Sequence, residues 1–199
     1  GSDQVELTTG RIATAAKGDW VVGALGKRSA TLEAVGDWRD IGPDNRFEAL
    51  SAAGVFGKCT ARSSVLRPLL GLSYRGHVTV EGSARNMRDY VQPRTDGPLM
   101  IPLILILGTS MDSGKTTTAR VIIRLLKARG LTVGGIKFTG VGRYRDILAM
   151  SDAGADVVCD FVDAGLPSTS CPREEFEFSI DHLLAHIATA GADVIVAEA

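Results

Sequence analysis

The stretch that decides the fold reads Gly108-Thr109-Ser110-Met111-Asp112-Ser113-Gly114-Lys115-Thr116-Thr117. An apolar run, residues 101–107, leads into it, and apolar residues at helical spacing follow it over residues 116–129. A glycine-containing loop that joins a strand to a helix is the setting of a phosphate-binding P-loop. We therefore expect a P-loop at residues 108–117, within an α/β domain.

The residue types in this loop suit phosphate chemistry. Backbone N–H groups of a tight loop and of a helix N-terminus converge on phosphate oxygens, and Gly114 lacks the Cβ that would keep a ligand away. Lys115 would place a cation against the β- and γ-phosphates, and Thr116 would offer its hydroxyl to Mg²⁺. All ten residues are therefore predicted to bind the nucleotide, with Lys115 also catalytic. Asp112 either contacts a second substrate or only shapes the loop.

The chain after the loop alternates between strand and helix. Strands are expected at residues 131–137, 156–161 and 193–198, and helices at 143–153 and 172–190. This alternation is typical of a mostly parallel sheet with right-handed crossovers. Because the sequence stops directly after residues 193–198, we expect a domain that is truncated at its C-terminus. The last strand would then be an exposed sheet edge or pair with another chain, for example in a homodimer.

The N-terminal half has a different pattern. Strand-length segments at residues 20–25, 30–35 and 77–81 are separated by glycine-containing turns, which predicts a small β-rich barrel or sandwich. Two prolines and a glycine mark a linker before the α/β half. We therefore predict three parts, listed in chain order: a β-rich N-terminal domain at 1–92, a linker at 93–98 and a P-loop NTPase-like domain at 99–199.

Composition narrows the environment and the partners. The chain has 199 residues, of which 45% are hydrophobic, and a net charge of −1, so we expect neither a nucleic-acid nor a membrane partner. The longest apolar run, residues 99–107, is too short to span a bilayer. The polar N-terminus does not read as a signal peptide, and the three cysteines lie far apart. These features favour a cytoplasmic protein with reduced thiols.

The pattern Gly-Thr-x-x-x-x-Gly-Lys-Thr over residues 108–116 resembles the P-loop of dethiobiotin synthetase and its relatives. It is also similar to that of the D-glutamate N-acetyltransferase-like P-loop family. Three more segments fall in the matching order: Gly135-Ile-Lys-Phe-Thr-Gly140, Asp146-Ile-Leu-Ala-Met150 and Ala192-Asp-Val-Ile-Val-Ala-Glu198. The resemblance covers roughly residues 100–199 and implies a P-loop NTPase fold. Phe138 stands where the first family has proline, and we do not expect a biotin enzyme.

The resemblance also implies roles for single residues. Lys137 would be catalytic and help to bind substrate or the transferring phosphate, and Asp146 and Glu198 would join Thr116 around Mg²⁺. The residues themselves support these roles, because ligands sit at the C-terminal ends of strands in open α/β sheets and Lys137 and Glu198 end predicted strands. For the same reason, residues 165–170 are a candidate substrate rim. The alternatives are an ordinary strand-end lysine, a charge at a helix start for Asp146, and a residue near the chain end for Glu198.

Together these expectations point to an enzyme of the ligase or kinase type. It would use a nucleoside triphosphate, ATP before GTP, with Mg²⁺ to transfer a phosphoryl group to a small acidic metabolite. Positioning and the charge of Lys115 would supply most of the catalysis. Two alternatives stay open: a regulatory GTP-binding switch whose β-rich half binds a protein, and an acyltransferase whose P-loop holds the diphosphate of coenzyme A.

Overall fold

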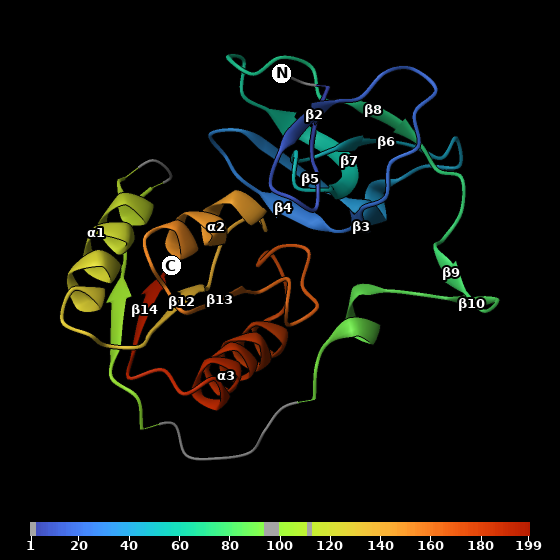
Figure 1. Ribbon diagram of the computed structural model, residues 1–199. Coiled ribbons are helices and arrows are strands. Elements are labelled where there is room, and N and C mark those ends of the chain that lie inside the picture. Colours follow the sequence, from blue (N-terminus) through green and yellow to red (C-terminus); the bar gives the residue numbers. More distant parts are fainter. Residues whose placement is uncertain (1–2, 94–99, 111–112) are drawn as a thin grey trace.

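The computed structural model describes residues 3–93, 100–110 and 113–199. The chain is a mixed α/β protein in which a β-rich part precedes a parallel sheet with helices (Figure 1). The predicted linker lies outside the described residues except for Pro93, and so do Met111 and Asp112 of the loop. Among the described residues, no helix combines the length and the apolar character needed to cross a membrane.

The β-rich part is built from short strands that pair almost entirely antiparallel. Its main sheet has the order β4-β5-β7-β6-β8, with β3 added in parallel to β7, and β1–β2 and β9–β10 form two separate hairpins. The strands are β1 Gln4–Glu6, β2 Ile12–Thr14, β3 Ala24–Leu25, β4 Lys27–Ser29, β5 Ala34–Asp37, β6 Arg46–Ala49, β7 Val55–Arg62, β8 Gly71–Ser73, β9 Thr79–Val80 and β10 Ser83–Ala84. Two 3-10 helices, Trp38–Asp40 and Met87–Tyr90, accompany them.

The strand positions predicted for this part are only partly right. Only the last two residues of segment 20–25 form a strand, and segment 77–81 shortens to β9. Segment 30–35 contains the turn between β4 and β5, closed by the bond from Glu33 N–H to the Ala30 carbonyl at 2.9 Å. Leu32, within this segment, is exposed in that turn. An apolar residue at a turn imitates the alternating pattern of a half-buried strand.

The α/β part confirms the predicted alternation of strands and helices. Its four strands are all parallel, in the order β11-β14-β12-β13. The elements are β11 Leu103–Ile106, α1 Lys115–Lys127, β12 Val133–Lys137, α2 Tyr144–Asp152, β13 Val157–Asp160, α3 Arg173–Thr189 and β14 Val194–Glu198. Their bounds agree with the predicted ones to within two residues.

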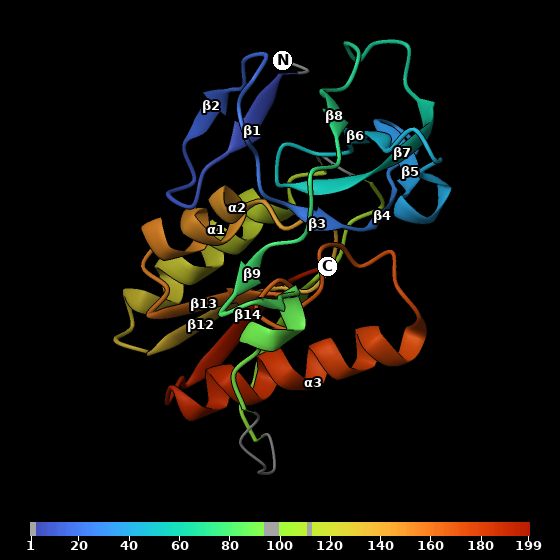
Figure 2. The same cartoon turned by 90° about the vertical axis from the view of Figure 1, so that its right-hand side faces the viewer.

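Helices cover both faces of this sheet. Helices α1 and α2 lie on one face and α3 lies on the other (Figure 2). Val194 and Val196 belong to the core cluster that contains residues of α1 and α2. Ile195, between them, packs in the cluster that contains α3. The period of two along β14 therefore points Glu198 toward the α1 and α2 side, as it does Val196.

The expectation of an exposed edge at residues 193–198 is wrong. Strand β14 lies between β11 and β12, and all five of its residues are buried. The crossover through α3 inserts the last strand into the middle of the sheet instead of adding it to one side. Strand β11 lies at one end of the strand order, and its Leu103 and Leu105 are 43% and 47% exposed.

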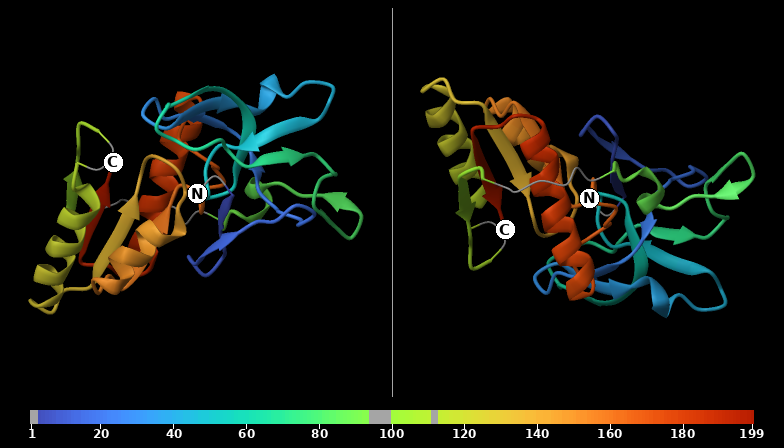
Figure 3. Two further views of the ribbon diagram at one scale, coloured as in Figure 1. Left: turned by 90° about the horizontal axis from the view of Figure 1, so that it is seen from above. Right: turned by 90° about the horizontal axis from the view of Figure 1, so that it is seen from below.

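The two parts lie side by side (Figure 3), and strand β4 and the hairpin β1–β2 of the β-rich part contact the α/β part. The Ser168 hydroxyl donates to the backbone carbonyl of Lys27 in β4. A Cβ added to Gly26 would lie 3.0 Å from Pro167, so the backbones approach closely there. These contacts place strand β4 against the loop that follows β13. The division into separately folding domains stays a prediction.

Candidate functional site

Gly108 lies close to the start of α1. A Cβ on Gly108 would lie 2.2 Å from the Ser113 hydroxyl oxygen and 2.8 Å from the side chain of Lys115, so a larger residue there would have to displace these side chains. Gly114 has φ 84° and is the N-cap residue of α1. That left-handed conformation suits glycine, because other residues pay a steric penalty for it. Gly114 is thus favoured by its backbone conformation, and Gly108 by the side chains packed beside it.

The ammonium group of Lys115 stays with the loop. It donates a hydrogen bond of 2.9 Å to the backbone carbonyl of Ser110. The first N–H groups of a helix have no partner within the helix. Lys115 and these N–H groups therefore lie on the same short stretch of chain, at the positive end of the α1 dipole.

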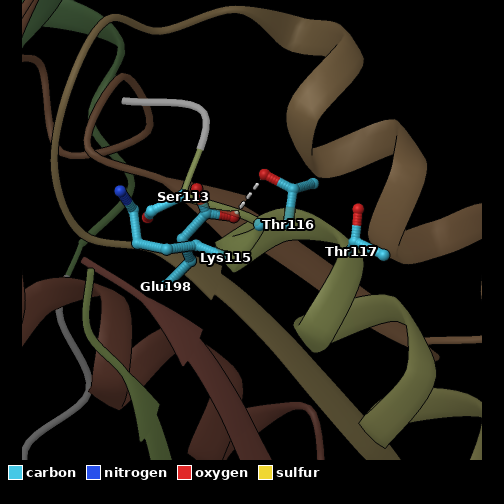
Figure 4. Close-up of a pocket in the computed structure, with 6 residues that line it drawn as sticks. Ser113, Lys115, Thr116, Thr117 and Glu198 are labelled. Atoms are coloured by element: carbon cyan, nitrogen blue, oxygen red, sulfur yellow. Dashed lines mark hydrogen bonds between the residues drawn. The ribbon is translucent and has the colours of Figure 1, made fainter. Parts of the chain in front are cut away.

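Thr116 connects this loop to the last strand. Its hydroxyl donates to the Glu198 carboxylate at 2.8 Å, although the two residues are 82 positions apart (Figure 4). Glu198 is only 7% exposed. A pocket of about 240 Å³ opens here and is lined by Ser113, Gly114, Lys115, Thr116, Thr117 and Glu198. The hydroxyl and carboxylate therefore face a space that a small ligand can enter.

Three charged residues form a row across the sheet. Glu198 is in register with Lys137 of β12, and Lys137 is in register with Asp160 of β13. Register partners on neighbouring strands point to the same face and lie about 4.8 Å apart. Each of them ends an apolar strand, and the row lies at the C-terminal edge, where ligands bind in open α/β sheets.

Lys137 is held tightly at the centre of this row. Only 6% of it is exposed, and its ammonium group forms an ion pair with Asp146 and donates to the Val141 carbonyl at 2.9 Å. The backbone at Gly140, with φ +110°, passes close to the lysine side chain, and a Cβ on Gly140 would lie 3.6 Å from the Cε of Lys137. The loop between β12 and α2 thus wraps around the lysine side chain.

Asp160 was not among the residues predicted for the site. It is 2% exposed, and burial raises the pKa of its carboxyl to about 7. The hydrogen bond that it accepts from Val162 N–H lowers this pKa, and the nearby Asp163 raises it. The sequence contained a usable signal, because Asp160 ends the apolar run Val157-Val-Cys just as Lys137 and Glu198 end theirs.

The predicted substrate rim lies beside Lys137. Val141 and Ser168 form an isolated antiparallel bridge, and Gly140 N–H donates to the Thr169 hydroxyl at 3.0 Å. The loops after β12 and β13 therefore support each other at the same edge of the sheet. Residues 165–170 adjoin the loop that holds Lys137, as a substrate rim would.

The structure sorts the predicted residues into two groups. The first group, gathered around the pocket, is residues 113–117 with Glu198, whereas residues 108–110 are not among those that line it. The second is Lys137 with Asp146, which pair with each other. Among the described residues, no three His, Cys, Asp or Glu side chains are grouped as a metal site. Mg²⁺ at a P-loop takes much of its coordination from phosphates and water, so a hydroxyl and one or two carboxylates are the relevant protein groups.

Comparison with known proteins adds no family. No protein-family model, no curated protein and no solved structure matches the chain.

Proposed function

We propose that this chain is a P-loop NTPase-like enzyme that binds a nucleoside triphosphate with Mg²⁺ at the Gly108–Thr117 loop. The observation that carries the proposal is the hydrogen bond between Thr116 and Glu198 at the pocket of that loop. It brings a hydroxyl from the start of α1 and a carboxylate from the neighbouring strand to one place. These are the oxygen ligands that Mg²⁺ prefers.

The electrostatics of Glu198 support a bound cation. Its carboxylate is buried, and Thr116 supplies only a neutral donor. Burying a charge is costly unless an opposite charge or several hydrogen bonds compensate it. A divalent cation next to Thr116, held directly or through water, would add an opposite charge beside this carboxylate.

The environment of Lys115 supports a bound phosphate. Among the described residues, its ammonium group donates a hydrogen bond to a backbone carbonyl of the loop. This hydrogen bond can be exchanged for one to a phosphate oxygen. A charge-assisted bond to phosphate is stronger than one to a neutral carbonyl. The N-terminus of α1 adds N–H donors and the helix dipole. A triphosphate would thus replace weaker internal contacts by stronger ones.

We assign the reaction to phosphoryl transfer or ligation on a small acidic metabolite, held near Lys137. Lys137 neighbours Glu198 in the sheet, about one strand spacing away. It is now paired with Asp146, so an acidic substrate gains access to its charge when Asp146 turns away. Coordination of Mg²⁺ by Asp146 would release the lysine in this way.

The test is a thermal-shift panel with ATP, GTP and acetyl-CoA, each with and without Mg²⁺. We expect the largest stabilisation from a triphosphate with Mg²⁺. Calorimetry on Lys115→Ala should then show roughly a ten- to hundredfold loss of affinity, because a charge-assisted contact is removed. Lys127→Ala, at the opposite end of α1, is the matched control and should bind normally. Unchanged affinity in Lys115→Ala would contradict the proposal, and stabilisation by acetyl-CoA alone would favour the acyltransferase instead.

A further inference from the structure

The first turn of α2 is capped from the other part of the molecule. The carboxylate of Glu6, at the end of β1, accepts hydrogen bonds from Tyr144 N–H at 3.2 Å and Arg145 N–H at 3.1 Å. Arg143, the N-cap residue of α2, makes no side-chain capping bond. A residue 138 positions earlier therefore fills the role that a local Ser, Thr, Asn or Asp usually has.

The hairpin that carries Glu6 is itself fixed in place. Glu6 N–H donates to the Ala52 carbonyl at 2.8 Å, which ties β1 to the rest of the β-rich part. At the hairpin turn, Gly10 has φ +77°, and a Cβ there would lie 2.5 Å from Leu148 of α2. The hairpin β1–β2 thus lies directly on α2, at its capped end and along its side (Figure 2).

The capped turn is the same turn that holds Lys137. Asp146 directly follows Arg145 and forms the ion pair with Lys137. The other acceptor of the Lys137 ammonium group is the carbonyl of Val141, just before the helix. Both contacts come from residues 141–146, and the two amides bonded to Glu6 lie within that segment.

We propose that Glu6 is a positioning residue that fixes the first turn of α2 and thereby holds Asp146 and Val141 against Lys137. The β-rich part is then a component of the site's framework. The importance of Lys137 rests on the proposed function, whereas the positioning itself is a property of the chain without ligands. A carboxylate near a helix N-terminus also stabilises the helix as a whole. The experiment must therefore separate an effect at Lys137 from a general loss of stability.

The reactivity of single lysines makes this separation. The full chain would be treated with an amine-acylating reagent, and the rate at Lys137 would be divided by the rate at Lys127 in the same sample. Lys127 is partly exposed and reports the reactivity of an amine in the folded chain, whereas global unfolding would also expose the buried Lys137. The free energy of unfolding, measured in urea for each variant, therefore gives the part of the Lys137 rate that global unfolding supplies, and opening of residues 141–146 raises the rate above that part. The variants are Glu6→Ala and Glu6→Gln. The matched control is Asp44→Asn, since Asp44 also accepts a backbone N–H within the β-rich part, from Arg46 at 3.2 Å.

Loss of a capping carboxylate opens a helix start roughly two- to thirtyfold more often. We expect the ratio to rise by that factor in Glu6→Ala, to rise less in Glu6→Gln because its amide oxygen still accepts one bond, and to stay constant in Asp44→Asn. An unchanged ratio in folded Glu6→Ala would overturn the inference, as would an equal rise in Asp44→Asn. If Glu6→Ala does not fold by circular dichroism, the ratio in Glu6→Gln decides. Failure of the wild-type chain to bind nucleotide would contradict the proposed function, but it would not affect the positioning role of Glu6 tested by the lysine rates.

Discussion

The two polar pairs at the C-terminal edge of the sheet are built differently. Thr116 and Glu198 join a neutral hydroxyl donor to a carboxylate at the pocket of the loop. Lys137 and Asp146 join opposite charges, so they compensate each other. On the proposed function, the first pair would receive a cation without rearrangement, whereas the second pair must open before either member binds a ligand. Neighbouring residues at one sheet edge can thus differ in how far they must rearrange to act.

The pairs also differ in what supports them. Thr116 and Glu198 come from α1 and β14, both within the α/β part. The second pair depends on α2, whose first turn is capped by Glu6 of the β-rich part. Changes in the β-rich part should therefore affect the Lys137 pair and leave the Thr116 pair almost unchanged.

The largest expected effect concerns Asp160, which borders the second pair. Its folded-state pKa near 7 lies above the value of 3.8 for an unperturbed aspartate. Between these values the folded state keeps a proton that the unfolded state has lost. The stability contribution is therefore fully present below about pH 4 and is lost as the pH rises to 7. The loss amounts to about 4 kcal/mol, from about 1.36 kcal/mol for each pH unit.

Asp160→Asn should remove this dependence. Urea unfolding between pH 4 and pH 8 would show a stability of the wild type that falls relative to the variant. Asp156→Asn, measured in addition between pH 4 and pH 2, is the control of opposite sign, because Lys127 lowers the pKa of Asp156 and its contribution to stability is lost as the pH falls below the pKa of a normal aspartate. Parallel curves of stability against pH for the wild type and Asp160→Asn would show that the pKa of Asp160 is not raised in the folded state.

A smaller effect is expected from breaking the second pair. Lys137→Met keeps the length of the side chain and leaves Asp146 with the more exposed Arg145 guanidinium, at 3.7 Å. Because the side chain of Asp146 is 22% exposed, the loss in the free energy of unfolding should lie below the about 3 kcal/mol that removal of one partner from a fully buried pair costs. The control is Lys58→Met, because the Lys58–Glu48 pair is part-exposed and such a pair contributes less than about 1 kcal/mol. Equal losses of stability in the two variants would show that the Lys137–Asp146 pair contributes no more than the more exposed Lys58–Glu48 pair, and would contradict this prediction.

The α/β part was readable from sequence because its signals are local and repeated. The apolar strands and the glycines around Lys115 predicted the parallel sheet and the loop at the start of α1. The strand order could not be predicted, because nothing in the sequence of β14 specifies which strands lie on either side of it. For this reason the expectation of an exposed edge at residues 193–198 was wrong. In the β-rich part, strands of two or three residues are held by partners distant in sequence, so a local sequence pattern does not identify these strands.

The site was readable to a similar degree. Lys137 and Glu198 could be singled out because each ends an apolar strand, and the same rule would have found Asp160. Two facts depended on three-dimensional structure. One is that Asp146 faces Lys137 in this structure, and the other is that Glu6 caps α2 from a distant strand. Neither contact could be predicted from a sequence motif, because the paired residues have no characteristic spacing along the chain.

The most direct measurement compares nucleotide binding with and without Mg²⁺ in Glu198→Gln and Asp146→Asn. Glutamine still accepts the Thr116 hydroxyl but lacks the charge that would attract the metal. We expect Glu198→Gln to lose roughly tenfold or more of the affinity gained from Mg²⁺, as is usual when support of a bound metal is removed. Asp146→Asn should lose less, because Asp146 must first leave Lys137, and Mg²⁺-free binding should be unchanged in both. Equal weakening of Glu198→Gln with and without Mg²⁺, or no weakening at all, would contradict a metal-ready pair at Thr116 and Glu198.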